Sequence, residues 1–304
     1  MVIKASLHQG RLKGKSKAQH NDRSFDTKKN DSIVNPDYAQ YNQYYVTSED
    51  GKFVPVTSGN NEFAKAEREF YRKNFKEGQD AKNKRNKEQG HKERCRTIEQ
   101  VRKNAKTAPM ELILQVGSEK KPYNDYANTG KMFRQMAMEL RKKYPQFKII
   151  NIAIHYDELT PHCHIRGVFI SKDAFGYDTP NQTKALQEMG FELPNKEEER
   201  SQKNNELVSF TAKNRERWYD IIEELEPEIT IDREPNKGAK HQSHKKYSQE
   251  KIDGLKKQYD EIQRNIISTD WGRLQAMEEF IDEKGLTKEF EEFVADYELP
   301  YDDD

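Results

Sequence analysis

Hydrophobic residues in this chain form short runs with two different periods, separated by long polar stretches. The runs with strand character are continuous or alternating and cover 111–116, 147–154 and 162–170. The runs with apolar residues at helical intervals of three and four cover 61–89, 129–144 and 206–225. We therefore predict strands over the first set and amphipathic helices over the second.

The predicted elements follow one another in an order that favours antiparallel pairing. Residues 2–8 and 44–47 read as earlier strands, and 229–232 read as an edge strand. From residue 111 onward the order is strand, helix, strand, strand, with a short connection between the last two. We predict an α+β fold in which helices pack on one face of a central antiparallel sheet. A charged helical extension is expected at the C-terminus.

The connection between the last two predicted strands contains three imidazoles and two carboxylates. Side chains alternate faces along a strand, so His162 and His164 share one face, and His155 at the end of the preceding strand faces them. Imidazole with carboxylate suits divalent Mn, Fe, Ni or Zn. We predict a metal site on these three histidines, with Glu158 bound to the metal or beside it. Asp157 has three possible roles: a metal ligand, a partner that orients a histidine, or a turn residue. We favour a position outside the ligand set.

Two motifs in this chain resemble those of the plasmid mobilisation relaxases of the Mob/Pre (MobV) family, within the His-hydrophobic-His endonucleases. The first is the metal motif itself, His155-x-x-Glu158-x-x-Pro161-His162-Cys163-His164. The second, His20-Asn21-Asp22-Arg23, resembles the family's His-Asn-x-Arg motif. Asn35-Pro36-Asp37 and Tyr41-Asn42-Gln43-Tyr44 follow it and are similar to the family's Asn-x-Asp and Asn-Tyr elements. The resemblance covers residues 2–172.

The resemblance implies an enzyme that nicks one strand at an origin of transfer by transesterification. The enzyme then stays attached to the 5′ phosphate and later rejoins the strand, which mobilises a plasmid or another mobile element. His20 is then the nucleophile, with Arg23 and Glu158 as further catalytic residues. We expect Mn²⁺ or Mg²⁺ as the metal, acting as a Lewis acid. The expected partners are single-stranded and supercoiled origin DNA, with a coupling protein and a second copy of the chain as further candidates.

Three alternatives remain open at this stage. A rolling-circle replication initiator uses the same metal histidines with a tyrosine nucleophile, drawn here from Tyr38, Tyr41, Tyr44 and Tyr45. These tyrosines are otherwise strand residues or stacking platforms for unpaired bases. A metal hydrolase activates water without a covalent intermediate. A DNA-binding or recombination accessory binds DNA without metal dependence.

The formal charge is zero, but it is unevenly distributed. The N-terminal region is basic, and we expect it to contact DNA through Lys13, Lys15, Lys17, Asn21, Arg23 and Tyr44. Residues 64–106 are also basic, which fits either a DNA contact or a solvated helix surface. The tail from Asp270 onward is acidic.

The domain boundaries follow this charge pattern. We predict a relaxase domain over 1–235, with a charged helical insertion at about 61–106. Residues 236–304 are predicted to form a basic linker, a charged helix and the acidic tail. His241 and His244 in the linker are expected to be surface residues or DNA contacts, because no carboxylate or cysteine partners them nearby.

Cysteine content and hydropathy indicate the cellular compartment in which the protein is expected. The two cysteines, Cys95 and Cys163, form no disulfide framework. The chain contains no apolar run long enough to span a membrane and no signal-peptide core at its start. We therefore expect a cytoplasmic protein with no membrane span.

Overall fold

The computed structural model describes residues 1–10, 18–24, 36–118, 121, 123, 125–158 and 160–233. All of these belong to one compact unit, Met1–Asn236. The predicted second domain at 236–304 lies outside the described residues, and so do Lys13, Lys15 and Lys17. The division into two domains therefore stays a prediction.

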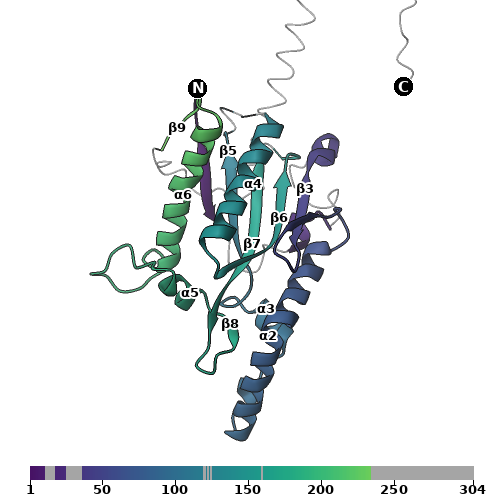
Figure 1. The fold of residues 1–304 in the computed structure, drawn as a ribbon, viewed down its shortest axis with the longest axis vertical. Helices are drawn as coiled ribbons and strands as arrows, with labels where there is room; N and C mark the ends of the chain where they lie inside the picture. Colours follow the sequence, from purple (N-terminus) through teal and green to yellow (C-terminus); the bar gives the residue numbers. More distant parts are fainter. Residues whose placement is uncertain are drawn as a thin grey trace, which may run out of the picture. The chain divides into compact units, whose positions relative to one another are not determined.

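The centre of this unit is an antiparallel sheet with the strand order β2-β5-β7-β6-β3-β4 (Figure 1). The strands are β2 (Ala5–Gln9), β3 (Gln43–Thr47), β4 (Phe53–Pro55), β5 (Met110–Val116), β6 (Phe147–His155) and β7 (His162–Lys172). A further strand, β8 (Asp178–Pro180), pairs with the end of β7. The predicted α+β fold with a central antiparallel sheet is confirmed.

The two ends of the described chain form a small sheet of their own. The predicted edge strand at 229–232 is β9 (Thr230–Ile231), and it pairs with β1 (Val2–Ile3). This pairing is parallel and separate from the main sheet. The predicted first strand at 2–8 is thus divided, since β1 joins β9 while β2 joins β5.

The helices lie close to the predicted ranges. They are α1 (Ala18–Asn21), α2 (Glu62–Glu88), α3 (Ile98–Lys103), α4 (Tyr126–Lys143), α5 (Gln182–Glu188) and α6 (Glu206–Leu225), with 3₁₀ turns η1 (Pro36–Tyr41) and η2 (Lys92–Arg94). Helix α4 begins before the predicted residue 129 because Asp125 accepts a hydrogen bond from the amide of Asn128. No helix of the described part is both long and apolar enough to cross a membrane.

One face of the sheet packs against α4 and α6, which lie side by side over it (Figure 1). Cys163 and Ile165 on β7 point into this core, together with Leu112 and Leu114 on β5. Between the helices, the rings of Phe133 and Trp218 stack with centroids 5.3 Å apart. This face forms the main hydrophobic core.

The opposite face of the sheet packs against α2, so the expectation that helices cover one face only was wrong. Tyr71 and Phe75 of α2 contact Ile150 of β6 and Val168 of β7. The physical reason is visible in the sequence of β6 and β7, whose continuous apolar runs are typical of strands buried on both faces. A strand with one solvated face alternates instead.

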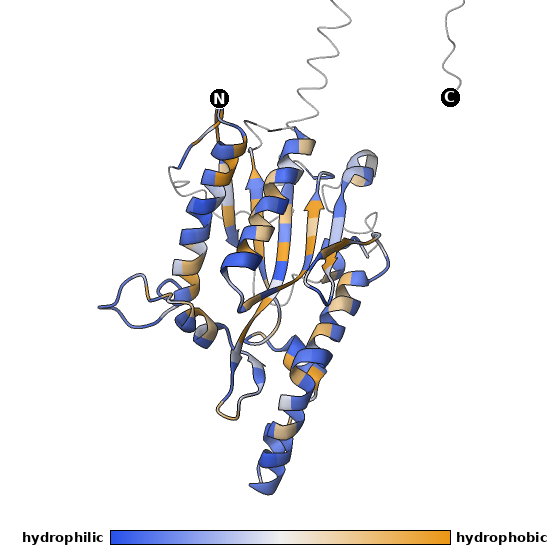
Figure 2. Ribbon diagram, in the orientation of Figure 1, coloured by the Kyte–Doolittle hydropathy of each residue, from blue (hydrophilic) through white to orange (hydrophobic). Residues whose placement is uncertain are grey.

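The buried side of α2 is not uniformly apolar. Phe63 and Phe75 are fully buried, whereas Ala66 and Phe70 are only partly buried. The carboxylate side chain of Glu67, also on α2, is buried. Because His162 and His164 alternate with the core residues of β7, they lie on this α2 face of the sheet. Figure 2 shows the apolar strands at the centre and a hydrophilic far half of α2.

Candidate metal centre

His155, His162 and His164 converge at the open end of the β6–β7 pair, as predicted. His155 stands directly opposite His162 in the register of the two strands. One ring nitrogen from each residue falls in a cluster whose atoms all lie within 4.8 Å of one another. His155 is fully buried, while His162 is partly exposed at the start of its strand. The site is therefore closed on the core side.

The second ring nitrogen of each histidine is held by an oxygen of the protein. His155 Nε2 lies 2.8 Å from the carbonyl of Asn21, and His162 Nδ1 lies 3.0 Å from the carbonyl of Thr160. His164 Nδ1 lies 3.1 Å from Oε1 of Glu111. These oxygens accept hydrogen bonds, so each of the three nitrogens carries the proton. The inner nitrogens then present lone pairs.

The three inner nitrogens fit a cation. His155 Nδ1 and His162 Nε2 are 3.3 Å apart, although neither has a hydrogen to donate to the other in this tautomer. His164 Nε2 is buried and has no hydrogen-bond partner among the described residues. Three unprotonated nitrogens that face one another repel unless a metal ion lies between them. The donor set therefore fits a divalent metal that accepts imidazole ligands.

Glu111 is a site residue that the sequence analysis missed. It lies on β5, opposite Arg166 of β7, and both side chains are buried. Arg166 Nε donates to Glu67 Oε1 of α2 at 2.7 Å, and Arg102 of α3 lies 3.3 Å from the other oxygen of Glu67. A buried chain of alternating charges thus runs from α3 and α2 to His164. Such a chain fixes the orientation of the His164 ring. Each buried charge in it depends on its neighbours for its hydrogen bonds, so removal of one member leaves the others without a partner.

The motif at residues 20–23 places a short helix under the histidines. The side-chain amide of Asn21 donates to Glu111 Oε1, and its carbonyl holds His155. Asp22 is buried and accepts from the amide of Phe63, so it caps the start of α2. Asn21 is 1% exposed and orients Glu111 and His155, and its contact with DNA stays a prediction.

Arg23 connects this motif to the turn between β6 and β7. Its backbone has a positive φ of 55°, which is unusual for a residue other than glycine. Its guanidinium donates two hydrogen bonds to Asp157, from Nη2 to Oδ1 at 2.6 Å and from Nε to Oδ2 at 3.0 Å. Nη2 also donates to Oε1 of Glu158 at 2.8 Å. This bidentate pairing holds the strained backbone in place. Asp157 is fully buried in this pair, and its carboxylate also groups with His155 and Glu158 within 4.8 Å, so its place outside the ligand set stays a prediction.

Glu158 lies beside the histidines and remains ionised. Burial by itself raises its pKa, but the neighbouring His162 and Arg23 lower it to about 2. Its second oxygen lies 3.8 Å from His162 Nε2. The structure therefore places Glu158 next to the three histidines, and its role as a metal ligand stays a proposal.

His20 lies on α1 with its ring centroid 6.4 Å from that of His164, nearly perpendicular to it. It is partly exposed. Burial first, and then the positive charge of Arg23, lower the pKa of its imidazole. The ring is thus neutral near pH 7, adjacent to the metal site and outside the ligand cluster.

The four candidate tyrosines have different environments. Tyr44 is 7% exposed, packs on the ring of His155 at 6.0 Å, and has a pKa raised to about 12 by burial. The hydroxyl of Tyr45 donates to Gln43. Tyr38 and Tyr41 are 41% and 50% exposed. Tyr44 therefore offers little surface to DNA, while the two exposed tyrosines are open to it.

Replacement of Glu111 with glutamine is expected to lower the Mn²⁺ affinity of the protein about 10- to 100-fold. The variant keeps the shape of the side chain but removes the charge that orients His164. Isothermal titration with Mn²⁺ measures the effect. Glu139→Gln, which breaks a remote ion pair with Arg217, is the matched control and should leave the affinity unchanged. Equal affinities for Glu111→Gln and wild type would contradict the orienting role.

The metal-free protein is expected to lose stability as the pH falls below about 6.5. Burial is the main cause that lowers the pKa values of His155 and His162, so the unfolded chain binds protons there that the folded chain does not. Stability that is complete above this pH is therefore lost on acidification. Thermal unfolding in EDTA at pH 7.5, 6.5 and 5.5 tests this expectation. A melting temperature that rises or stays constant towards pH 5.5 would refute it.

Fold and site together define an α+β protein with a three-histidine metal centre on adjacent antiparallel strands. The model of the plasmid recombination enzyme family (Mob_Pre) matches residues 56–205, which contain β5, β6, β7 and all three histidines. The sequence resemblance to this family of enzymes is thus confirmed over the range that contains the metal motif. The motif at residues 20–23 lies outside the matched range.

Two solved structures similar to this chain are of the MobM relaxase domain (MOBV; Mob_Pre) with Mn and plasmid pMV158 oriT DNA. One, at pH 5.5, is 17% identical with a TM-score of 0.44, and the match covers 82% of this chain and 99% of that one. The other, at pH 6.8 with a 3′ thiophosphate, is 17% identical with a TM-score of 0.46 and coverages of 81% and 98%. No curated protein matches the chain.

Proposed function

We propose that this protein is a DNA relaxase that nicks and rejoins one strand at an origin of transfer. The observation that carries the proposal is the convergence of three unprotonated imidazole nitrogens beside a neutral His20, in a chain that the model of the plasmid recombination enzyme family matches over residues 56–205. The reaction serves the mobilisation of a plasmid or another mobile element.

His155, His162 and His164 would hold the metal, with Glu158 beside them. A divalent metal held by these residues would supply Lewis-acid chemistry at the scissile phosphate. Mn²⁺ suits three imidazoles better than Mg²⁺, which prefers oxygen ligands and keeps its water. Glu158 and Asp157 balance the charge of Arg23, and this triad fixes the turn that carries His162.

His20 is the proposed nucleophile. Its neutral nitrogen attacks phosphorus, the bond from phosphorus to the 3′ oxygen breaks, and a phosphoramidate forms on the 5′ side. The imidazole loses its other proton and the departing 3′ oxygen gains one, so a free 3′ hydroxyl remains. The reverse attack by this hydroxyl reseals the strand. The lowered pKa of His20 keeps the attacking lone pair available near neutral pH.

The exposed tyrosines give a place for the DNA strand near this centre. The rings of Tyr38, Tyr41 and Tyr126 lie within 6.2 Å of one another. Asn42, the residue after Tyr41, accepts a hydrogen bond from the backbone amide of Tyr156, the residue after His155. These rings can stack with unpaired bases close to the metal site. Lys13, Lys15 and Lys17 remain proposed phosphate contacts, and a coupling protein and a second copy remain proposed partners.

A nicking assay on the supercoiled replicon that carries the gene tests the proposal. We expect relaxation to open circles with Mn²⁺, none with EDTA, and recovery when Mn²⁺ is restored. The nick should map to one strand at one position. Relaxation that persists in EDTA, or cuts that are scattered over both strands, would contradict it.

A further inference from the structure

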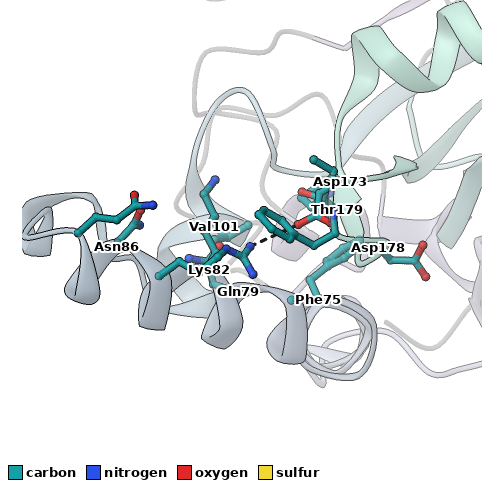
Figure 3. Close-up of a pocket in the computed structure, with 14 residues that line it drawn as sticks. Phe75, Gln79, Lys82, Asn86, Val101, Asp173, Asp178 and Thr179 are labelled. Carbon is teal, nitrogen blue, oxygen red and sulfur yellow. Dashed lines mark hydrogen bonds and ion pairs between the residues drawn. The ribbon is translucent and has the colours of Figure 1, made fainter.

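A cavity of about 360 Å³ lies between α2, α3 and the β7–β8 hairpin, and no metal-centre residue lines it (Figure 3). Helix α2 and its C-cap residue provide nearly half of its lining, through Gly78, Gln79, Lys82, Arg85, Asn86 and Gln89. Apolar side chains, Phe75 and Val101 among them, form the rest of the lining together with the hairpin. The cavity thus combines an apolar wall with a polar one.

The polar wall is unusual for a helix that packs on a hairpin. In its first half α2 packs through buried aromatic residues, as amphipathic helices do. From Gly78 to Gln89 the same face carries only hydrogen-bonding, cationic or glycine residues, and Figure 2 shows this half as hydrophilic. Lys82 and Gln89 are exposed, and Gln79, Arg85 and Asn86 are partly exposed, so a polar ligand in the cavity can reach these groups.

Two groups in this wall are free to bind a ligand. Lys82 has no ion pair or hydrogen bond among the described residues. The side-chain nitrogen of Asn86 is buried and has no hydrogen-bond partner there. Both are donors, so the complementary ligand carries acceptor oxygens and negative charge. A phosphate group meets both requirements.

The acidic residues of the cavity are already neutralised. Asp173 accepts from the amides of Phe175 and Tyr177 and lies 3.7 Å from Arg85. Asp178 is paired with Lys172 at 2.8 Å. Among the charged residues that line the cavity, Lys82 therefore carries a positive charge that no carboxylate of the described residues neutralises.

An exposed aromatic ring lies beside these donors. Phe175, at the turn of the hairpin, is 64% exposed, and the guanidinium of Arg85 lies 3.7 Å from its ring centre. A cation on a phenyl ring next to a free lysine is the arrangement by which proteins stack a base and hold its phosphate.

We infer that this cavity binds an unpaired nucleotide of a DNA strand, with its base on Phe175 and its phosphate at Lys82 and Asn86. The inference rests on the proposed function for its choice of a DNA strand as the source of the nucleotide. The contact uses no residue of the metal motif and needs no metal. This contact would make the charged helical insertion a second DNA-binding site for the same strand.

The tryptophan introduced by Phe175→Trp provides the probe, and the full-length protein is kept in EDTA so that the metal centre does not contribute. We expect an oligothymidylate of eight nucleotides to quench its fluorescence by stacking. In that background Lys82→Ala should weaken binding and lower the slope of log affinity against log salt by about 0.7. Lys84→Ala on the same helix, outside the cavity, is the matched control and should change the quenching curve little.

Phe175→Ala should weaken oligonucleotide binding about fivefold or more by fluorescence anisotropy, whereas Phe175→Tyr should bind like the wild type. Equal losses for Lys82→Ala and Lys84→Ala, or no quenching at all, would overturn the inference.

The same titration is repeated with thymidine monophosphate and with inorganic phosphate in place of the oligonucleotide. If the free nucleotide binds as tightly as the oligonucleotide, the pocket takes nucleotides but the assignment to a DNA strand is overturned. Because nicking is measured separately with Mn²⁺, failure here leaves the relaxase proposal untouched.

Discussion

Alanine at His162 is expected to lower the affinity for Mn²⁺ by at least about 100-fold and to abolish nicking at metal concentrations that saturate the wild type. Changes to residues that merely orient a ligand cost about 10- to 100-fold, and loss of one of three imidazoles removes a bond to the metal itself. His162 is the ligand of choice because it is partly exposed at the start of β7, so its truncation leaves the core intact. Calorimetric Mn²⁺ titration measures the affinity directly.

His91→Ala serves as the control for this prediction. His91 is a partly exposed histidine at the N-cap of η2 and belongs to no metal cluster of the described residues. This variant should bind Mn²⁺ and nick DNA like the wild type. Tight Mn²⁺ binding by His162→Ala, with unchanged circular dichroism, would show that the three histidines are not the metal site.

Alanine at His20 is expected to reduce the nicking rate by about 10³-fold or more while Mn²⁺ affinity stays unchanged. Removal of a covalent nucleophile eliminates the reaction path rather than weakening one contact within it. His20 is outside the cluster of inner nitrogens, so metal binding does not depend on it. Single-turnover nicking of a labelled oligonucleotide gives the rate, and calorimetry gives the affinity.

The tyrosine alternative makes the opposite prediction. Tyr44→Phe removes only a buried hydroxyl that accepts from Asn42, and Tyr41→Phe removes only an exposed one. Both variants should nick within a few-fold of the wild-type rate if His20 attacks. The raised pKa of Tyr44, about 12, makes its phenolate scarce at neutral pH. Loss of nicking in either tyrosine variant, with His20→Ala active, would move the nucleophile to tyrosine.

The local part of the site could be predicted from the sequence. His162 and His164 share a face because strand side chains alternate, and Ile165 and the continuous apolar run after them identified the strand. The helix at 206–225 was predicted to the residue because its apolar spacing is regular and Pro227 follows. These features depend only on neighbours in sequence.

The remainder depends on pairings that no local pattern contains. Glu111 meets His164 because β5 and β7 are paired, and Glu67 meets Arg166 because α2 crosses the sheet on that face. A carboxylate within an otherwise apolar strand was the available signal for Glu111. In the same way, Asn21 could be placed near the metal motif by resemblance, but its contact with Glu111 followed only from the folded chain.

The most direct test of the account is to identify the bond between protein and DNA. The wild type is incubated with the supercoiled replicon and Mn²⁺, stopped with detergent and digested, and the peptide attached to DNA is sequenced by mass spectrometry. The account predicts one peptide that contains His20, linked to a 5′ phosphate by an acid-labile phosphoramidate, and no such species in EDTA. A 5′ phosphate on a tyrosine, or a metal-dependent nick with no protein attached, would contradict it.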